Sequence, residues 1–208
     1  MQYKYAKRFI DVLLSVIIFI IISPIFLLIM VCVKFFIGSP IFFSQKRTGK
    51  DLKCFFLIKF RTMTNEKDKN GSLLPDYMRQ TKFGNFLRSS SLDELPELLS
   101  IIKGDMSLIG PRPLPTVYDK YYTEFELIRF DVKSGLIPPD SVDDSAIISW
   151  EKQFEYDVDY AKNVNLFNDV KIFFKVFRIL LQRNKSDYGS FIRKPLNEER
   201  KDKVKNNL

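Results

Sequence analysis

The longest apolar stretch lies near the start of the chain and predicts a membrane segment. Residues 12–33 read VLLSVIIFIIISPIFLLIMVCV and carry no charge. About 20 apolar residues are enough for a helix to span a bilayer. A secretory signal explains the stretch less well, because it is too long and no small-x-small cleavage site follows it. A buried core helix is also disfavoured, since no other segment is apolar enough to enclose it.

A proline and the flanking charges complicate a simple span. Ser23 and Pro24 lie in the middle of the stretch, where proline removes a backbone donor and bends a helix. Lys7 and Arg8 precede the stretch and Lys34 follows it, and positive charge marks the cytoplasmic side. A helix that enters the membrane, breaks at the Ser-Pro pair and returns would place both basic flanks on the cytoplasmic side. An ordinary signal-anchor with a tolerated proline is the alternative, and these residues leave both open.

Beyond the membrane segment the pattern predicts short strands and several helices. Residues 41–49 and 51–63 read as two strands around a turn, and residues 64–80 read as a polar surface loop. Apolar residues at helical spacing predict helices over 92–103, 117–132, 150–160 and 166–182. The last helix is basic and Phe-rich, which fits a core face and a membrane-interface helix equally.

The expected fold class is α+β, with a re-entrant N-terminal membrane helix and a small mixed α/β cytoplasmic domain that carries interfacial amphipathic helices. A length of 208 residues suits one domain with an appendage. We place the membrane helix at residues 1–37, the main domain at 38–185 and a charged, flexible tail at 186–208.

Composition restricts the chemistry. The chain has no histidine, which excludes Ser-His-Asp and Cys-His catalysis and any histidine metal ligand. Its two cysteines, Cys32 and Cys54, are too few for a zinc site. A metal would therefore have oxygen ligands, which favours Mg²⁺ or Mn²⁺. A net charge of +8 with 20 Phe suits an anionic membrane surface, whereas scattered basic residues argue against nucleic-acid binding.

Three clusters of polar residues could carry chemistry. They are the adjacent carboxylates Asp93 and Glu94 preceded by Arg88, then Arg112 between Pro111 and Pro113, and Lys59 with Arg61 at the end of a predicted strand. Arginine binds phosphate in a bidentate manner and lysine acts as a point charge. Mg²⁺ would join the carboxylates to a diphosphate. This set fits phosphoryl transfer, in which an aspartate can be the nucleophile.

Each cluster also has a simpler explanation. Residues 91–94 read SLDE and match a capping box, and acids at a helix N-terminus are stabilising without any catalytic role. Taken alone, capping is the favoured interpretation of Asp93 and Glu94. Arg112 could form a structural salt bridge, and Lys59 and Arg61 could lie at a solvated strand end or contact lipid headgroups.

Read in order, these residues resemble a known family. The motifs are Lys7-Arg8-x-x-Asp11, Ser23-Pro24, Phe43-x-Gln45-x-Arg47-x-Gly49, the KFRTM of residues 59–63, the LRxxSLDELP of residues 87–96 and the KGDMSLIGPRP of residues 103–113. The chain resembles the bacterial sugar transferases, the monotopic phosphoglycosyl transferases, in a nearly minimal form. The resemblance covers roughly residues 4–182.

The resemblance implies transfer of a sugar 1-phosphate from a UDP-sugar to a polyprenol phosphate at the cytoplasmic face of the bacterial inner membrane, with release of UMP. Asp93 would be the nucleophile and an Mg²⁺ ligand, and Glu94 would deprotonate or place the acceptor. The residues implied in substrate binding are Lys59, Arg61, Arg88, Arg112, Pro111 and Pro113. Ser23 and Pro24 would be the membrane break. The expected partners are the donor, the acceptor and membrane phospholipid, with no nucleic acid; the sugar and the oligomeric state are not specified.

One segment departs from the family pattern. After Lys133 the family usually reads P-G-[IV]-T-G-x-A-Q-V-x-G-R, whereas residues 134–145 read SGLIPPDSVDDS. Gly135 is retained, Ser145 stands in place of the arginine, and Asp140, Asp143 and Asp144 add negative charge. One hypothesis is altered donor specificity, for example for a sugar with an amino group. The other is a catalytically weakened membrane-bound scaffold that retains the fold, in which case restoring arginine at position 145 should raise activity.

Overall fold

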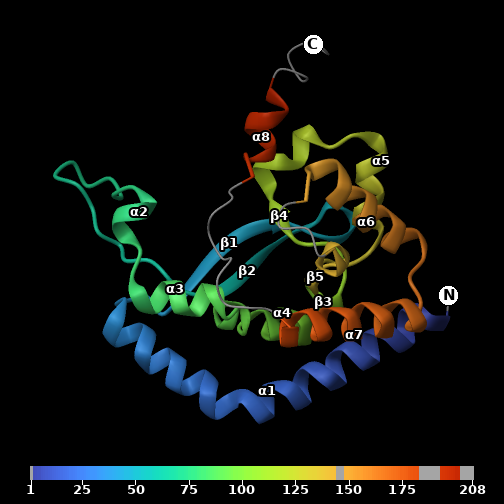
Figure 1. Ribbon diagram of the computed structural model, residues 1–208, viewed down its shortest axis with the longest axis horizontal. Coiled ribbons are helices and arrows are strands. Elements are labelled where there is room, and N and C mark those ends of the chain that lie inside the picture. Colours follow the sequence, from blue (N-terminus) through green and yellow to red (C-terminus); the bar gives the residue numbers. More distant parts are fainter. Residues whose placement is uncertain (1, 144–147, 183–192, 202–208) are drawn as a thin grey trace.

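The computed structural model describes residues 2–143, 148–182 and 193–201. It shows a mixed α/β fold with a long apolar helix at its N-terminus, which confirms the expected fold class in these respects (Figure 1). Asp144 and Ser145, two of the positions that depart from the family pattern, lie outside the described residues.

Helix α1 (Gln2–Phe36) contains the predicted membrane segment. Its part from Ala6 to Phe36 has a mean hydropathy of 3.3 in its most apolar window and is long enough to cross a membrane. Only 17% of that window is buried against the rest of the molecule. At 1.5 Å per residue the helix is about 50 Å long, well beyond the roughly 30 Å of a bilayer core. Most of the apolar surface of α1 is therefore left uncovered by the rest of the described structure.

The Ser-Pro pair lies within α1, and the serine compensates for the proline. Pro24 has no N–H, so the carbonyl of Ile20 lacks its usual partner four residues later. The hydroxyl of Ser23 donates to that carbonyl at 2.8 Å. A serine side chain that satisfies a freed carbonyl is one of the ways in which membrane helices tolerate proline.

Both halves of α1 attach to the same body. In the first half, Arg8 donates to the carbonyls of Ile101 and Ile102 at 2.6 and 3.0 Å. In the second half, the buried side chains Phe26, Ile29 and Val33 form one core cluster with Phe60 and Leu87. Figure 1 shows α1 bent and running along the whole underside of the molecule, with α3, α4 and α7 between it and the strands.

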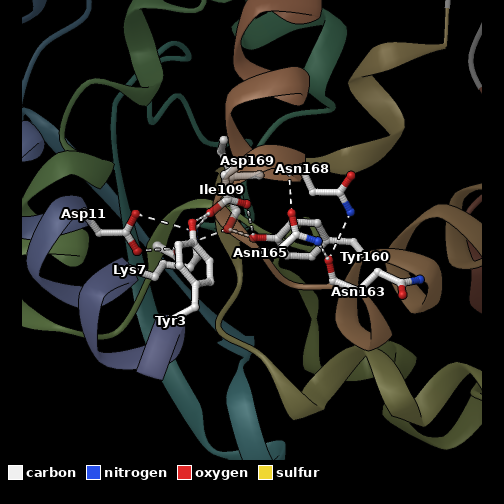
Figure 2. Close-up of polar contacts among 10 residues, drawn as sticks. Tyr3, Lys7, Asp11, Ile109, Tyr160, Asn163, Asn165, Asn168 and Asp169 are labelled. Atoms are coloured by element: carbon white, nitrogen blue, oxygen red, sulfur yellow. Dashed lines mark hydrogen bonds and ion pairs between the residues drawn. The ribbon is translucent and has the colours of Figure 1, made fainter. Parts of the chain in front are cut away.

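A buried polar junction fixes the start of α1 (Figure 2). Tyr3 and Lys7 both donate to Oδ2 of Asp169 in α7 (Leu166–Gln182) at 2.7 Å. The hydroxyl of Tyr160 donates to the other oxygen of that carboxylate, also at 2.7 Å. Asp169 thus joins three helices, because Tyr160 belongs to α6 (Trp150–Lys162).

The predicted hairpin is confirmed. Strands β1 (Phe42–Thr48) and β2 (Cys54–Phe60) pair antiparallel, and β4 (Leu114–Pro115) joins β1 at its other edge. A second, two-stranded sheet consists of β3 (Ser107–Ile109) and β5 (Gly135–Ile137), which run parallel. Next to this pair a Cβ on Gly135 would lie 2.1 Å from the amide nitrogen of Gly110, so the two backbones touch where only glycine fits.

One of the predicted helices is not formed as predicted. Helices α6 and α7 occupy the predicted ranges within two residues. The predicted helix over 117–132 is wrong: this region contains two 3₁₀ turns, Thr116–Tyr121 and Ile128–Asp131, around the short α5 (Glu124–Leu127). Thr123 and Glu126 form a capping box, which starts a new helix in the middle of the predicted one. The remaining helices are α2 (Asp76–Arg79), α3 (Lys82–Ser89), α4 (Glu97–Lys103) and α8 (Leu196–Glu199).

The described part of the predicted flexible tail is packed instead. Leu196 of α8 is fully buried, and Arg200 donates to both carboxylate oxygens of Glu126 at 2.7 and 2.8 Å. The guanidinium of Arg193 lies 3.5 Å from the centroid of the Trp150 ring. The charge of this segment suggested solvent exposure, but its arginines are paired with partners from earlier in the chain.

Candidate functional site

The site is built around one lysine and two glutamates from neighbouring elements. Lys59, near the end of β2, places its Nζ 2.6 Å from Oε1 of Glu94 and 3.2 Å from Oε1 of Glu97. Glu94 belongs to the 3₁₀ turn η2 (Leu92–Glu94), and Glu97 begins α4. Arg112 approaches the same Glu94 oxygen at 3.8 Å from the loop after β3. The structure therefore brings together three residues that the sequence analysis took from its three separate clusters.

The backbone at η2 overturns the capping interpretation. Ser91 adopts a left-handed conformation with φ of 56°, and its side chain makes no capping hydrogen bond. The predicted continuous helix over 92–103 is likewise interrupted, since α4 begins only at Glu97, after Pro96. A proline favours the first turn of a helix because it has no N–H to leave unpaired. Asp93 and Glu94 thus lie on a separate turn and are free of a capping role.

No hydrogen bond or ion pair joins the carboxylate of Asp93 to another side chain among the described residues, and the nearest interaction is with its own backbone amide. Burial raises the pKa of this carboxyl above its ordinary value, although Lys59 and, to a smaller extent, Arg88 act in the opposite direction. Arg88 lies on the exposed surface of α3 and belongs to the electrostatic surroundings of Asp93. A half-buried carboxylate beside cations and without a side-chain partner is suited to attack an electrophile.

Lys59 and Glu97 shift the pKa values of one another. Burial raises the pKa of Glu97, which is 3% exposed, to about 7, against the opposing effect of Lys59. Burial works against the charge of Lys59, but Glu97 and Glu94 outweigh it, so the pKa of the ammonium lies above its ordinary value. Lys59 therefore stays charged and holds Glu94 in a fixed place.

The proline-rich loop presents Arg112 on a rigid support. Arg129 donates to the carbonyl of Arg112 at 2.7 Å, and the amide of Gly135 donates to the carbonyl of Pro111 at 3.0 Å. Arg129 is buried and is itself held by the buried Asp157 at 2.8 Å. The side chain of Arg112 remains 46% exposed. Pro111 and Pro113 are both buried, which indicates that they shape the loop.

Arg61 lies apart from this group. Its guanidinium donates to the carbonyl of Ser39 at 3.2 Å, and no hydrogen bond or ion pair joins it to Asp93 or Glu94 among the described residues. Two residues that the sequence analysis did not select lie closer. Glu97 is one. Arg47 on β1 is the other, since it interacts electrostatically with both Glu97 and Arg112.

Both missed residues have only a partial signal in the sequence, which becomes decisive once the hairpin register is known. Arg47 faces the same side of the hairpin as Lys59, because side chains alternate along a strand and the register pairs Phe43 with Lys59. Glu97 follows Asp93 by four residues and Glu94 by three, a spacing that brings side chains together on a continuous helix, but η2 and Pro96 interrupt that helix here. These relationships were missed because the hairpin register was not known and because the capping hypothesis gave Asp93 and Glu94 a different role.

The acidic segment that departs from the family pattern lies next to Arg112. Asp140 is in the 3₁₀ turn Pro139–Val142; burial raises the pKa of its carboxyl, and Arg112 opposes this rise. Tyr156 donates to Asp143 at 3.0 Å. The described part of this segment is thus folded onto the domain, with one carboxylate close to a residue of the site.

The donor set fits Mg²⁺ as a substrate-bridging ion. No group of three or more candidate metal-ligating side chains occurs in the part of the chain that the structure describes. Mg²⁺ is usually held by one or two carboxylates together with substrate phosphates and waters. Asp93, whose carboxylate has no side-chain partner among the described residues, is the residue that would hold Mg²⁺ in this way.

The chain is similar to proteins of known family. The family model described as bacterial sugar transferase matches residues 2–183. A Bacillus subtilis protein named uncharacterized sugar transferase EpsL is 46% identical over 166 residues, which make up 80% of this chain and 82% of that protein. The exopolysaccharide production protein ExoY of Sinorhizobium fredii is 34% identical, over 82% of this chain and 83% of that protein.

Longer relatives carry names that describe a reaction. The UDP-glucose:undecaprenyl-phosphate glucose-1-phosphate transferase of Klebsiella pneumoniae is 36% identical over 88% of this chain. The UDP-N-acetylgalactosamine-undecaprenyl-phosphate N-acetylgalactosaminephosphotransferase of Aeromonas hydrophila is 35% identical over 86% of this chain. The match spans only 41% and 44% of these two proteins.

Proposed function

The chain belongs to the bacterial sugar transferase family, and on that premise we propose that it transfers a sugar 1-phosphate from a UDP-sugar to undecaprenyl phosphate and releases UMP. The enzyme class is phosphoglycosyl transferase. The observation that carries the proposal is the carboxylate of Asp93, which is half-buried beside cations and has no side-chain partner among the described residues, while its neighbour Glu94 is held by Lys59 at 2.6 Å.

In the first step the carboxylate of Asp93 attacks the phosphorus that bears the sugar. The bond between this phosphorus and the oxygen bridging to UMP breaks, and UMP leaves with that electron pair. A sugar-phosphoryl-aspartate remains. Arg112, which approaches Glu94 at 3.8 Å, and Arg88, whose charge acts on Asp93, would neutralise the phosphate charge, since phosphoryl transfer depends mainly on positioning and on stabilising charge. Mg²⁺, when bound at Asp93, would supply further neutralisation of the diphosphate.

In the second step a phosphate oxygen of the acceptor attacks the same phosphorus and Asp93 is released. Glu94 takes the proton of a protonated acceptor phosphate, and Lys59 fixes the glutamate for this task. The covalent intermediate divides one transfer into two, so the soluble donor and the lipid acceptor need not be bound together.

We further propose that α1 is a re-entrant helix at the cytoplasmic face of the inner membrane. Arg8 in its first half and Phe26 and Val33 in its second half all pack on one body, which supports both ends of α1 lying on one side of the membrane. Helix α7 lies beside α1 in Figure 1, and its exposed apolar residues include Phe167 and Phe174, which suits membrane phospholipid.

The reaction is tested by UMP release from a panel of UDP-sugars, with Mg²⁺ and undecaprenyl phosphate, in wild type and Asp93→Asn. Asp131→Asn is the matched control, because Asp131 is exposed on a 3₁₀ turn outside the site. We expect UMP from one or more donors with wild type and the control, and none with Asp93→Asn. If a folded wild-type protein releases no UMP with any donor, the weakened scaffold becomes the better description.

The topology is tested by cysteine labelling. Cys32 and Cys54 are replaced by serine, and single cysteines are introduced at Phe9 and Phe35, which are 68% and 81% exposed. A membrane-impermeant thiol reagent should label both positions from the cytoplasmic side only. Labelling of one position from the opposite side would show that α1 spans the membrane.

A further inference from the structure

A shallow apolar groove follows the second half of α1. It has a volume of about 260 Å³ and is lined by Leu27, Met30, Val31, Lys34, Phe35 and Ile41. Five of these residues come from α1, and Ile41 comes from the segment just before β1. The adjoining face of the helix packs on the domain through Ile29 and Val33, so the groove lies at the margin between the helix and the body.

Two cations meet at the end of this groove. Lys34 donates to the hydroxyl of Ser39, and Arg61 donates to the carbonyl of the same residue at 3.2 Å. The amide of Arg61 also bonds to the carbonyl of Ile41, which lines the groove. Neither cation has a carboxylate partner among the described residues. Burial, and then the nearby Arg79, lower the pKa of Arg61, which agrees with a site that has an excess of positive charge.

We propose that this groove binds the acceptor, with the isoprenoid chain next to its phosphate along Leu27, Val31 and Ile41 and the phosphate between Lys34 and Arg61. The inference deepens the proposed function and rests on it for the identity of the lipid. A phosphate monoester carries a charge of about −1.5 to −2 at neutral pH, which two unpaired cations match better than the single charge of a phospholipid diester does.

The position of the groove suits delivery to the reacting carboxylates. Arg61 follows Lys59 by two residues, and two residues of extended chain span about 7 Å. Lys59 contacts Glu94, the residue assigned to receive the acceptor phosphate. The side chain of Arg61 bonds at Ser39, so a phosphate held between Lys34 and Arg61 lies beside the site and would move from there toward Glu94 to react, with its chain along α1.

The experiment measures binding of undecaprenyl phosphate to the full chain in nanodiscs of zwitterionic phospholipid, independently of turnover. Lys34→Gln removes one cation, and Val31→Trp fills the groove without changing charge. Lys46→Gln is the matched control, because Lys46 is exposed on β1 and points to the opposite side of the hairpin from Lys59. Phosphatidylglycerol serves as the competing lipid. In a second measurement, the KM for acceptor and for UDP-sugar is determined for each variant.

We expect the Kd for undecaprenyl phosphate to rise about tenfold in Lys34→Gln, as loss of one charge-assisted hydrogen bond implies. Val31→Trp should weaken binding similarly, Lys34→Arg should restore it, and the KM should rise for the acceptor alone. An unchanged Kd in both variants, or equal displacement by phosphatidylglycerol, would overturn the groove as an acceptor site. If wild type binds the acceptor in this way but releases no UMP from any donor, the proposed function fails and the groove stands.

Discussion

Lys7 and Asp169 form an ion pair of 2.7 Å although 162 residues separate them in the chain. The carboxylate is 10% exposed and also accepts hydrogen bonds from the hydroxyls of Tyr3 and Tyr160 (Figure 2). One buried side chain thus connects the two helices whose exposed apolar residues suit a membrane, α1 and α7, to the folded domain.

Replacing Asp169 by alanine should destabilise this junction. The change removes the partner at 2.7 Å and leaves the ammonium of Lys7 with only the longer ion pair to Asp11 at 3.5 Å. Breaking a buried pair typically costs about 3–5 kcal/mol, and the remaining pair with Asp11 should place the loss at the lower end of this range. Chemical denaturation in detergent checks the free energy of unfolding. Glu155→Ala is the control, since its ion pair with Lys152 is exposed and should contribute less than about 1 kcal/mol. Equal losses in the two variants would contradict the junction's role.

Replacing Ser23 by alanine should destabilise α1 by about 1–3 kcal/mol, because the carbonyl of Ile20 then loses its donor in an apolar environment. Pro24→Ala supplies a backbone donor to the same carbonyl. The double variant Ser23→Ala/Pro24→Ala should therefore lose less stability than Ser23→Ala alone. Thermal unfolding in nanodiscs measures the three variants, and strictly additive losses would show that the hydroxyl does not serve this carbonyl.

Replacing Glu97 by glutamine should reduce the pH dependence of stability. Burial raises the pKa of Glu97 from 4.5 to about 7, so the folded protein binds a proton that the unfolded chain releases between these values. The stabilising contribution of this group to the free energy of unfolding is fully present below pH 4.5 and is lost as the pH rises through about 7. Urea unfolding at pH 5 and pH 8 measures the change. Glu198→Gln, at an exposed position in α8, should keep the wild-type dependence.

Replacing Gly135 by alanine should impair both folding and donor binding. The added Cβ would lie 2.1 Å from the amide nitrogen of Gly110, and the two backbones would have to separate. The hydrogen bond from Gly135 to Pro111 supports the loop that carries Arg112, so the KM for UDP-sugar should rise together with a loss of about 1–3 kcal/mol. Ser141→Ala in the next turn is the control. A stable Gly135→Ala with wild-type kinetics would show that this close approach does not position Arg112.

Local patterns predicted the elements whose partners lie nearby in the chain. The apolar stretch of α1, the hairpin around Gly49 and the amphipathic α7 all follow from periodicity and turn residues. The helix predicted over 117–132 failed because its apolar spacing reflects burial on several short turns, and only the capping box at Thr123 marked a restart. The packed tail was missed because the partner of Arg200 is Glu126, 74 residues earlier.

The candidate site was likewise predicted in part from local sequence patterns, and its other members required contacts between distant segments. Residue types and order selected Lys59, Glu94 and Arg112, and the structure brings these three together. The SLDE motif favoured capping because the same four residues can form a capping box or contain a pair of reactive carboxylates. The left-handed conformation of Ser91 distinguishes the two, and an isolated sequence does not specify a positive φ at a serine. Identifying Glu97 and Arg47 as members of the site required the position of the hairpin relative to α4.

The bonds from Arg8 to the carbonyls of Ile101 and Ile102 also set an order of events during synthesis. These partners lie 93 and 94 residues later in the chain. A bacterial ribosome adds about 5–20 residues per second, so roughly 5–20 s pass between the emergence of the first half of α1 and that of its partners. During this interval the nascent chain is an apolar helix with unpaired basic residues and no domain to hold it. The contacts of Arg8 therefore form only after translation has passed α4, and those of Tyr3 and Lys7 with Asp169 only after it has reached α7. A stall before these points would leave α1 without the contacts that hold it to the domain.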